Sequence, residues 1–233
     1  NGDAAAISTG IVTYGNTVSI NAGSGTIEMV GQASAAGARS GFLFGLHDAS
    51  VASIVNISSS ATGEAIKLTG VARGVGDAIA LSGIVTLTAS GGGSISLDGD
   101  ALGTGRSVVA GNYYHGILNL YANSGDITLN GNTKAVEVAA AVITGQTSGP
   151  SKINIGQGGS VASSSSNVTI TGDQISVAAG GIAVTSTGQL VVEPFSTSFS
   201  AALSWPVTNF STGSGLTGLR LGKEGNTANI TIA

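Results

Sequence analysis

The chain has 233 residues with 38 glycines, 12 acidic and 8 basic residues, no cysteine and a formal net charge of -4. Charged residues make up 9% of the chain, well below the ~25% of an average globular domain, and this composition excludes an ordinary helical protein. Hydrophobic residues make up 42%, which excludes a disordered chain because a core can form and offset the entropy lost on ordering.

The distribution of charged and apolar residues narrows the possible partners. The basic residues are scattered, whereas a nucleic-acid surface needs clustered cations that neutralise phosphates together. No stretch approaches the ~18 to 20 continuous apolar residues of a membrane span. Without cysteine, disulfides and thiolate metal sites are excluded. We therefore expect no nucleic-acid partner, no membrane insertion, and no cofactor or metal.

Four segments in chain order follow one template: an apolar-x-apolar unit, a small polar turn, a second apolar-x-apolar unit and a glycine. They span residues 18–31, 55–70, 85–99 and 118–131, and a fifth segment at 153–160 breaks the template after its first unit. Their starting positions differ by 37, 30, 33 and 35 residues. A variable period with constant cores indicates a solenoid with loops of unequal length, because a helical repeat would hold its period tightly.

Apolar-x-apolar units predict short strands with one face turned inward and one outward. A third unit follows each template, at 42–46, 79–81, 108–109 and 136–138, so we expect three strands per repeat. Like residues should then stack along the repeats. One inward column would hold Ile20, Ile57, Leu87, Leu120 and Ile155, and a second would hold Met29, Leu68, Leu97 and Leu129. The polar residues that would face outward are Ser19, Asn56, Thr86, Asn119 and Asn154.

Glycine closes the second unit of each template, at Gly31, Gly70, Gly99 and Gly131. Glycine adopts positive φ without steric cost. We therefore expect these glycines to form the corners at which the chain turns into the next strand.

The predicted fold class is all-β: a right-handed parallel β-helix, or solenoid, with about three short strands per coil and one aromatic-rich excursion near the C-terminus. We divide the chain into coils at 1–193, an aromatic and proline-containing excursion or cap at 194–217, and the start of a further coil at 218–233. A β-sandwich or jelly roll would not repeat one template, and a propeller would show a longer, four-stranded repeat with an aromatic signature.

Several segments resemble a known family. Residues 124–131 (Ser-Gly-Asp-Ile-Thr-Leu-Asn-Gly) and 167–172 (Asn-Val-Thr-Ile-Thr-Gly) look like the repeats of filamentous-haemagglutinin-like secreted exoproteins and related large bacterial adhesins. The stretch from Leu190 to Ala233 is similar to a spacer between β-helical blocks of that group. The resemblance implies export across the outer membrane, an extracellular or cell-surface location, and a role in adhesion, aggregation or biofilm matrix. Because no secretion-targeting domain is recognisable, an interior piece of a longer protein is expected.

Asp98 and Asp100, with Arg106 and His115 nearby in the sequence, are the candidate catalytic residues. Polysaccharide lyases and glycosidases need two or three carboxylates that converge on a groove. In a strand the two aspartates would share one face, whereas after Leu97 they could also be solvated corner residues, which is the interpretation we favour. We therefore expect no enzyme, and keep a carbohydrate-active enzyme as the alternative.

The segment Asn112, Tyr113, Tyr114 and His115 is the candidate glycan-binding loop, because aromatic rings pack on sugars and polar neighbours add hydrogen bonds. The competing interpretation is a loop whose aromatic rings cover the coil. Taken with the resemblance, the sequence predicts a structural or adhesive segment of a bacterial surface or secreted filamentous protein. Its expected partners are a host or neighbouring-cell surface, a glycan, or a second copy, since coil ends expose unpaired strand edges that favour end-to-end self-association into a filament.

Overall fold

The computed structural model describes residues 10–14, 17–33, 40–46, 53–110, 116–131, 135–138, 151–177 and 180–233. Throughout these residues the chain is all-β, with 22 strands and no helix. Accordingly, no helix in this part of the chain is long and apolar enough to cross a membrane. Short alternating apolar and polar runs bounded by glycine, serine and asparagine form strands and turns, as the sequence predicts.

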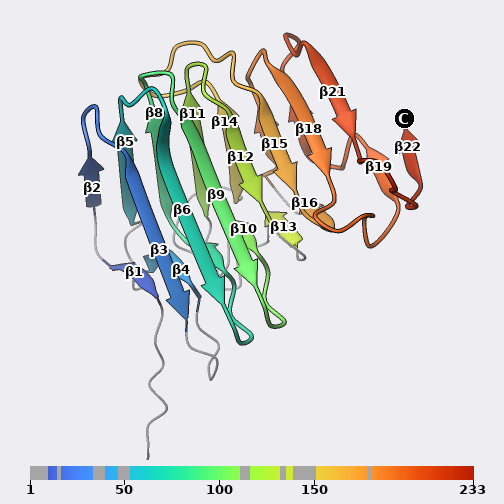
Figure 1. Ribbon diagram of the computed structural model, residues 1–233, viewed down its shortest axis with the longest axis horizontal. Helices are drawn as coiled ribbons and strands as arrows, with labels where there is room; N and C mark the ends of the chain where they lie inside the picture. Colours follow the sequence, from blue (N-terminus) through green and yellow to red (C-terminus); the bar gives the residue numbers. More distant parts are fainter. Residues whose placement is uncertain are drawn as a thin grey trace, which may run out of the picture.

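Three parallel sheets contain all but two of the described strands, and each sheet takes every third strand of the chain (Figure 1). Sheet A holds β1 (Ile11–Tyr14), β4 (Phe42–Leu46), β7 (Ile79–Leu81), β10 (Val108–Ala110), β13 (Ala135–Val138) and β16 (Gln174–Val177). Sheet B holds β2 (Thr17–Asn21), β5 (Ile54–Ser59), β8 (Ile84–Ala89), β11 (Ile117–Ala122), β14 (Lys152–Gly156), β17 (Ile182–Val184) and β20 (Phe210–Thr212). Sheet C holds β3 (Ile27–Ala33), β6 (Glu64–Ala72), β9 (Ser94–Ala101), β12 (Ile127–Asn130), β15 (Val168–Thr171), β18 (Gln189–Glu193) and β21 (Gly218–Leu221).

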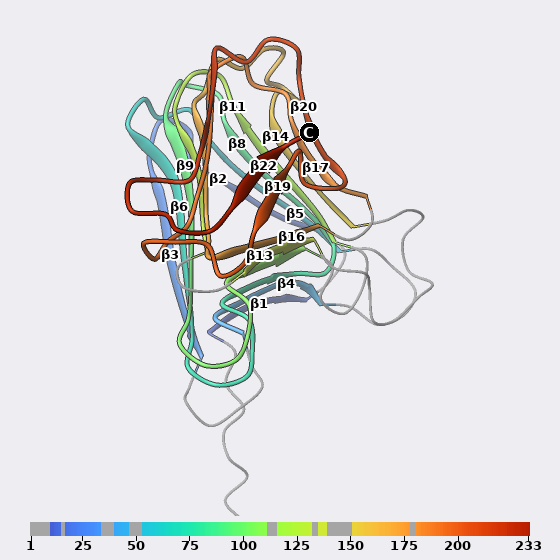
Figure 2. The same ribbon diagram turned by 90° about the vertical axis from the view of Figure 1, so that its right-hand side faces the viewer.

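This succession of parallel strands is consistent with a β-helix or solenoid. In Figure 1 the strands follow one another along the long axis in sequence order, from the blue N-terminal end to the red C-terminal end. Figure 2 shows the three sheets as three walls around a common interior. One buried apolar cluster fills that interior with side chains from every sheet, among them Phe44 of sheet A, Ile57 of sheet B and Leu68 of sheet C.

The strand registers confirm the predicted columns. The sheet B column pairs in the order Ile20, Ile57, Leu87, Leu120 and Ile155, and the sheet C column in the order Met29, Leu68, Leu97 and Leu129. The third unit stacks in sheet A as Phe42, Ile79, Val108 and Val136. Ile20 remains 37% exposed because β2 is the first described strand of its sheet and has a neighbour on one side only.

The expected role of the template glycines is wrong. Gly31, Gly70 and Gly99 lie in register inside β3, β6 and β9, and neither they nor Gly131 adopt positive φ. They are required for space, because a Cβ on Gly99 would lie 2.2 Å from the carbonyl oxygen of Ser107. The same atom on Gly31 or Gly70 would lie 2.3 Å from a backbone carbonyl oxygen of the segment that enters sheet A. The close approach of two backbones, and not a left-handed corner, therefore excludes side chains here.

The aromatic segment after residue 193 contributes strands to two sheets. β20 extends sheet B next to β17, whereas β19 (Leu203–Trp205) pairs only with β22 (Ile230–Ile232). Trp205 and Phe210 are buried, and their ring centroids lie 4.9 Å apart. Figure 2 shows β19 and β22 across the C-terminal end of the interior. The aromatic rings thus pack on the core at this end, and the division of the chain at 193 and 217 stays a prediction.

Candidate functional site

Asp98 and Asp100 lie within β9, so the preferred interpretation of them as corner residues is wrong. The strand runs on to Ala101 because Gly99 lets it pass close to sheet A and Ala101 is buried. Leu97, Gly99 and Ala101 point inward, which leaves both carboxylates on the outer face of sheet C. Residues two apart in a strand are separated by roughly 6.5 to 7 Å along it.

The surroundings of Asp98 hold its carboxylate in place. It accepts hydrogen bonds from the Ser96 hydroxyl at 3.2 Å and from the Asn130 amide at 3.3 Å. These donors come from the same strand and from β12, the next strand of the sheet. The two aspartates are thus brought to one face, where Asp98 is bound by neutral groups.

Arg106 does not join these aspartates. Its guanidinium pairs with Asp77 instead, through Nε to Oδ1 and Nη2 to Oδ2, both at 2.9 Å, and its backbone nitrogen donates to Oδ1 at 2.8 Å. The Asp77 side chain is 7% exposed and that of Arg106 is 29% exposed. This bidentate pair locks together the turns that precede β7 and β10, which is a structural role.

The candidate loop Asn112, Tyr113, Tyr114 and His115 lies outside the described residues, and so does His47. No group of three or more His, Cys, Asp or Glu side chains with metal-binding geometry occurs in the described ranges. The proposed glycan role of the loop therefore stays a prediction.

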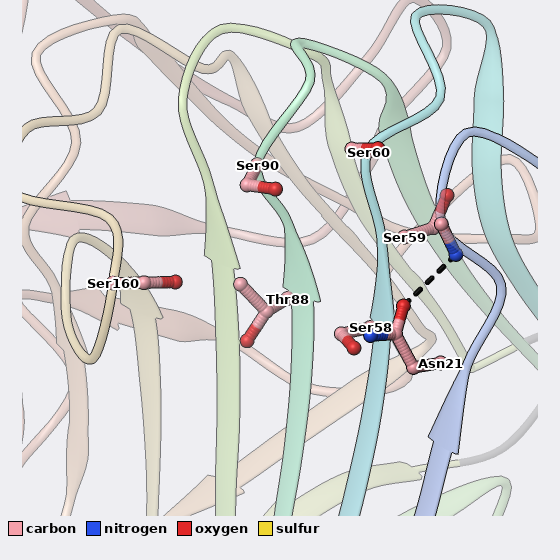
Figure 3. A pocket seen from close by; sticks show the side chains of 8 residues that line it. Asn21, Ser58, Ser59, Ser60, Thr88, Ser90 and Ser160 are labelled. Atoms are coloured by element: carbon pink, nitrogen blue, oxygen red, sulfur yellow. Dashed lines mark hydrogen bonds between the residues drawn. The ribbon is translucent and has the colours of Figure 1, made fainter.

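A groove of about 340 Å³ lies on the outer face of sheet B, near the ends of β2, β5 and β8 (Figure 3). Its lining is Asn21, Gly23, Ser58, Ser59, Ser60, Thr88, Ser90 and Ser160, and we call it the sheet B groove. Figure 3 shows Asn21, Ser58 and Thr88 in a row on three neighbouring strands, with Ser160 facing Thr88 from a loop. Every lining side chain is small and uncharged, so the polar groups that the side chains bring to the groove are hydroxyls and one amide.

One wall of the groove is the loop that follows β14. Gly158 and Val161 exchange backbone hydrogen bonds at 2.9 Å in both directions, which closes residues 158–161 into a tight turn. This turn lies against the ring of Tyr121, because a Cβ on Gly158 would be 2.3 Å from the Tyr121 Cζ. Burial raises the pKa of the Tyr121 hydroxyl above its ordinary value near 10.

The polar side chains beside the groove satisfy one another. In the neighbouring outward column, Nδ2 of Asn119 donates to the Thr86 hydroxyl at 3.1 Å, and Nδ2 of Asn154 donates to Oδ1 of Asn119 at 2.8 Å. By contrast, the hydroxyls of Ser58 and Thr88 make no hydrogen bond with the described part of the protein. The hydroxyls of Ser58 and Thr88 therefore remain available for hydrogen bonds to a ligand. The side chains of the neighbouring column use theirs to bond to one another.

Comparison of the chain with protein-family models, curated proteins and solved structures returned no significant match.

The sequence analysis did not predict the groove, although two features of the sequence indicate it. The outward hydroxyls of Ser58 and Thr88 stand two positions after the polar residues of the predicted outward column. The fifth segment departs from the template at Gly156, and that departure produces the wall loop. A break in an otherwise regular repeat was thus the sequence feature that marked the site.

Proposed function

We propose that the chain is a right-handed parallel β-helix with three strands per coil, and that it forms a structural and adhesive segment of a bacterial surface or secreted protein of the filamentous-haemagglutinin type. The strand order of the three sheets carries this proposal, because each sheet advances by three strands at every step. Right-handedness follows from the strong preference for right-handed crossovers between parallel strands.

A coil of this kind suits a scaffold that displays side chains on flat outer walls. Each coil adds about 4.8 Å of length, and its interior is a continuous apolar stack that resists bending. The outer faces carry in-register polar columns, such as Asn56, Thr86, Asn119 and Asn154 on sheet B. The hydrogen bonds that join Thr86, Asn119 and Asn154 hold this wall together, whereas the hydroxyls of Ser58 and Thr88 stay available for contact with another surface, which supports adhesion over catalysis.

The extracellular or cell-surface location rests on the resemblance of residues 124–131 and 167–172 to exported adhesin repeats. A test is to coat fluorescent beads with the purified chain and to count beads bound to epithelial cells and to bacteria. Beads coated with serum albumin are the control. We expect more adherent beads with the chain than with albumin, and counts no higher than those of albumin on both cell types would overturn the adhesive role.

A carbohydrate-active enzyme is the second candidate, and the shared outer face of Asp98 and Asp100 favours it. Alternation along the strand places their two carboxyl groups on one face, and a pair of carboxyl groups is what glycosidases require. Release of reducing ends from a panel of polysaccharides tests this activity. If the wild type cleaves a polysaccharide and Asp98→Asn does not, the chain is an enzyme. If the wild type cleaves none of the polysaccharides, the enzymatic function is contradicted.

Self-association into a filament is the third candidate. Within the described residues, β2 and β3 each have a single neighbour in their sheets, so the outer edge of each strand is a candidate for pairing with a second copy. Light scattering at rising protein concentration tests it. Growth of the particle mass supports stacking of coils, and a constant monomer mass contradicts it.

A further inference from the structure

We propose that the sheet B groove binds a neutral saccharide. The inference deepens the adhesive role by naming a ligand class and a site, and it rests on that proposed function for its biological meaning. Three properties of the groove favour this ligand class: its lack of charge, its unused hydroxyl groups and its wall.

The lack of charge selects the ligand. None of the eight lining residues is acidic or basic, so the groove cannot compensate the desolvation of a phosphate, sulfate, carboxylate or metal ion. An apolar ligand is equally disfavoured, because the lining hydroxyls would lose their water without replacement. A polyol is the ligand class whose groups both donate and accept hydrogen bonds without carrying charge.

The hydroxyl groups of Ser58, Thr88, Ser90 and Ser160 are available to such a ligand. None of the four donates or accepts through its Oγ within the described part of the chain, whereas the Ser59 hydroxyl is committed to the Gly25 carbonyl at 2.6 Å. The side-chain oxygen Oδ1 of Asn21 accepts a hydrogen bond from the Gly23 backbone nitrogen at 2.9 Å, which orients this side-chain amide at the end of the row. The groove thus presents hydroxyls at one end and a fixed amide at the other.

The shape of the groove suits a short chain of sugar rings. From Thr88 through Ser58 to Asn21 the row crosses three paired strands, a span of two strand spacings or about 10 Å. The volume of about 340 Å³ lies at the lower end of the range for small-ligand sites. Ser160 faces this row from the wall, and Figure 3 shows its hydroxyl directed toward Thr88.

The wall is built with backbone conformations that residues other than glycine rarely adopt. Gly158 and Gly159 have φ of 156° and 58°, and the Gln157 backbone nitrogen is anchored to the Thr185 hydroxyl at 3.1 Å. The tight turn, the anchor and the contact with Tyr121 hold Ser160 in one position. A preformed wall lowers the entropy that a ligand must overcome on binding.

The experiment is a titration of the purified chain with lactose, mannotriose and chitotriose, followed by saturation-transfer NMR and calorimetry. Tetragalacturonate and a heparin tetrasaccharide are the anionic probes. We expect saturable binding of at least one neutral sugar that exceeds the binding of both anions. No saturable binding of any neutral probe, or stronger binding of an anion, would overturn the proposal.

Three variants locate the site. Thr88→Val and Ser90→Ala each remove one hydroxyl and should weaken the neutral sugar roughly three- to tenfold, the usual effect of one lost hydrogen bond. Thr169→Val is the matched control, because Thr169 also points outward from a strand but lies on sheet C, away from the groove. Equal loss in Thr88→Val and Thr169→Val, or no loss in either groove variant, would assign the binding elsewhere.

The bead assay separates this inference from the adhesive role. If beads coated with Thr88→Val adhere as well as wild-type beads while sugar binding is weakened, the groove binds sugar but adhesion uses another surface. If wild-type beads do not adhere and the sugar binds, the groove inference stands and the adhesive function fails. If adhesion occurs without any sugar binding, the groove inference fails alone.

Discussion

Replacing Gly99 by alanine should destabilise the protein although it adds a single methyl group. The new Cβ would lie 2.2 Å from the Ser107 carbonyl oxygen and 2.6 Å from its carbonyl carbon. Ordinary van der Waals contact begins near 3.4 Å, so the two backbone segments must separate by about 1 Å. Neither neighbour is a flexible side chain that could rotate away.

The clash also acts on a hydrogen bond. The Ser107 carbonyl accepts from the Ile79 backbone nitrogen at 2.9 Å, which begins the pairing of β7 with β10. Overpacking of a core costs about 1 to 3 kcal/mol, and here backbone lies on both sides of the contact. We expect a loss of about 3 kcal/mol in the free energy of unfolding, which lowers the melting temperature by roughly 6 to 12 °C in a domain of this size.

The matched control is Gly63→Ala, in the turn before β6. A Cβ there meets nothing within 4 Å, and Gly63 does not have positive φ. It should leave stability unchanged or raise it by about 0.4 to 1 kcal/mol, because alanine restricts the unfolded chain. Urea denaturation followed by circular dichroism compares the two variants. Equal midpoints for Gly99→Ala and Gly63→Ala would refute the close-approach explanation of the template glycines.

Three further predictions test other parts of the structure. Asp77→Ala should cost about 2 to 3 kcal/mol in urea denaturation, since it removes the carboxylate that accepts three hydrogen bonds from Arg106, and the double variant with Arg106→Ala should lose less than the sum of the two single losses; additive losses would contradict the pairing. Tyr121 should ionise above pH ~10 in the absorbance difference between wild type and Tyr121→Phe. Because its folded pKa is raised above the unfolded value, its contribution to stability is complete below pH ~10 and is lost as the pH rises further; a midpoint at or below 10 would contradict its burial. Trp205→Ala should cost about 3 kcal/mol in thermal unfolding, whereas Phe195→Ala, at a 40% exposed position, should cost far less; similar losses would argue against packing of Trp205 on the core.

The columns of the core were predictable because a strand has a period of two and the template repeats. Once Ile57, Leu87 and Leu120 are assigned to the same position of the template, parallel pairing leaves a single register that buries all of them. The polar column beside them follows from the same register. Local pattern and global stacking agree, which is why the amino-acid sequence was enough to predict this part of the fold.

The structural role of individual residues was harder to predict from the sequence. A glycine at position 70 indicates that no side chain fits there. The sequence alone does not distinguish a positive φ from a close backbone neighbour as the cause. The neighbour of Gly70 is the Ala78 carbonyl, which comes from the chain entering sheet A. Likewise, Asp98 and Asp100 follow an apolar unit in the manner of turn residues, and only the inward packing of Gly99 and Ala101 keeps them in the strand.

The sequence by itself determined an all-β chain of stacked parallel strands, because alternation and repetition act between neighbours in the chain and between like positions of successive repeats. The tertiary structure alone decided that Arg106 pairs with Asp77, and that the loop after β14 folds over Tyr121 to wall a groove beside Thr88. These contacts join residues about 30 or more positions apart, and they involve turns and loops in which the apolar alternation of the strands is absent. Their geometry depends on loop lengths and backbone approach, which the apolar template does not encode.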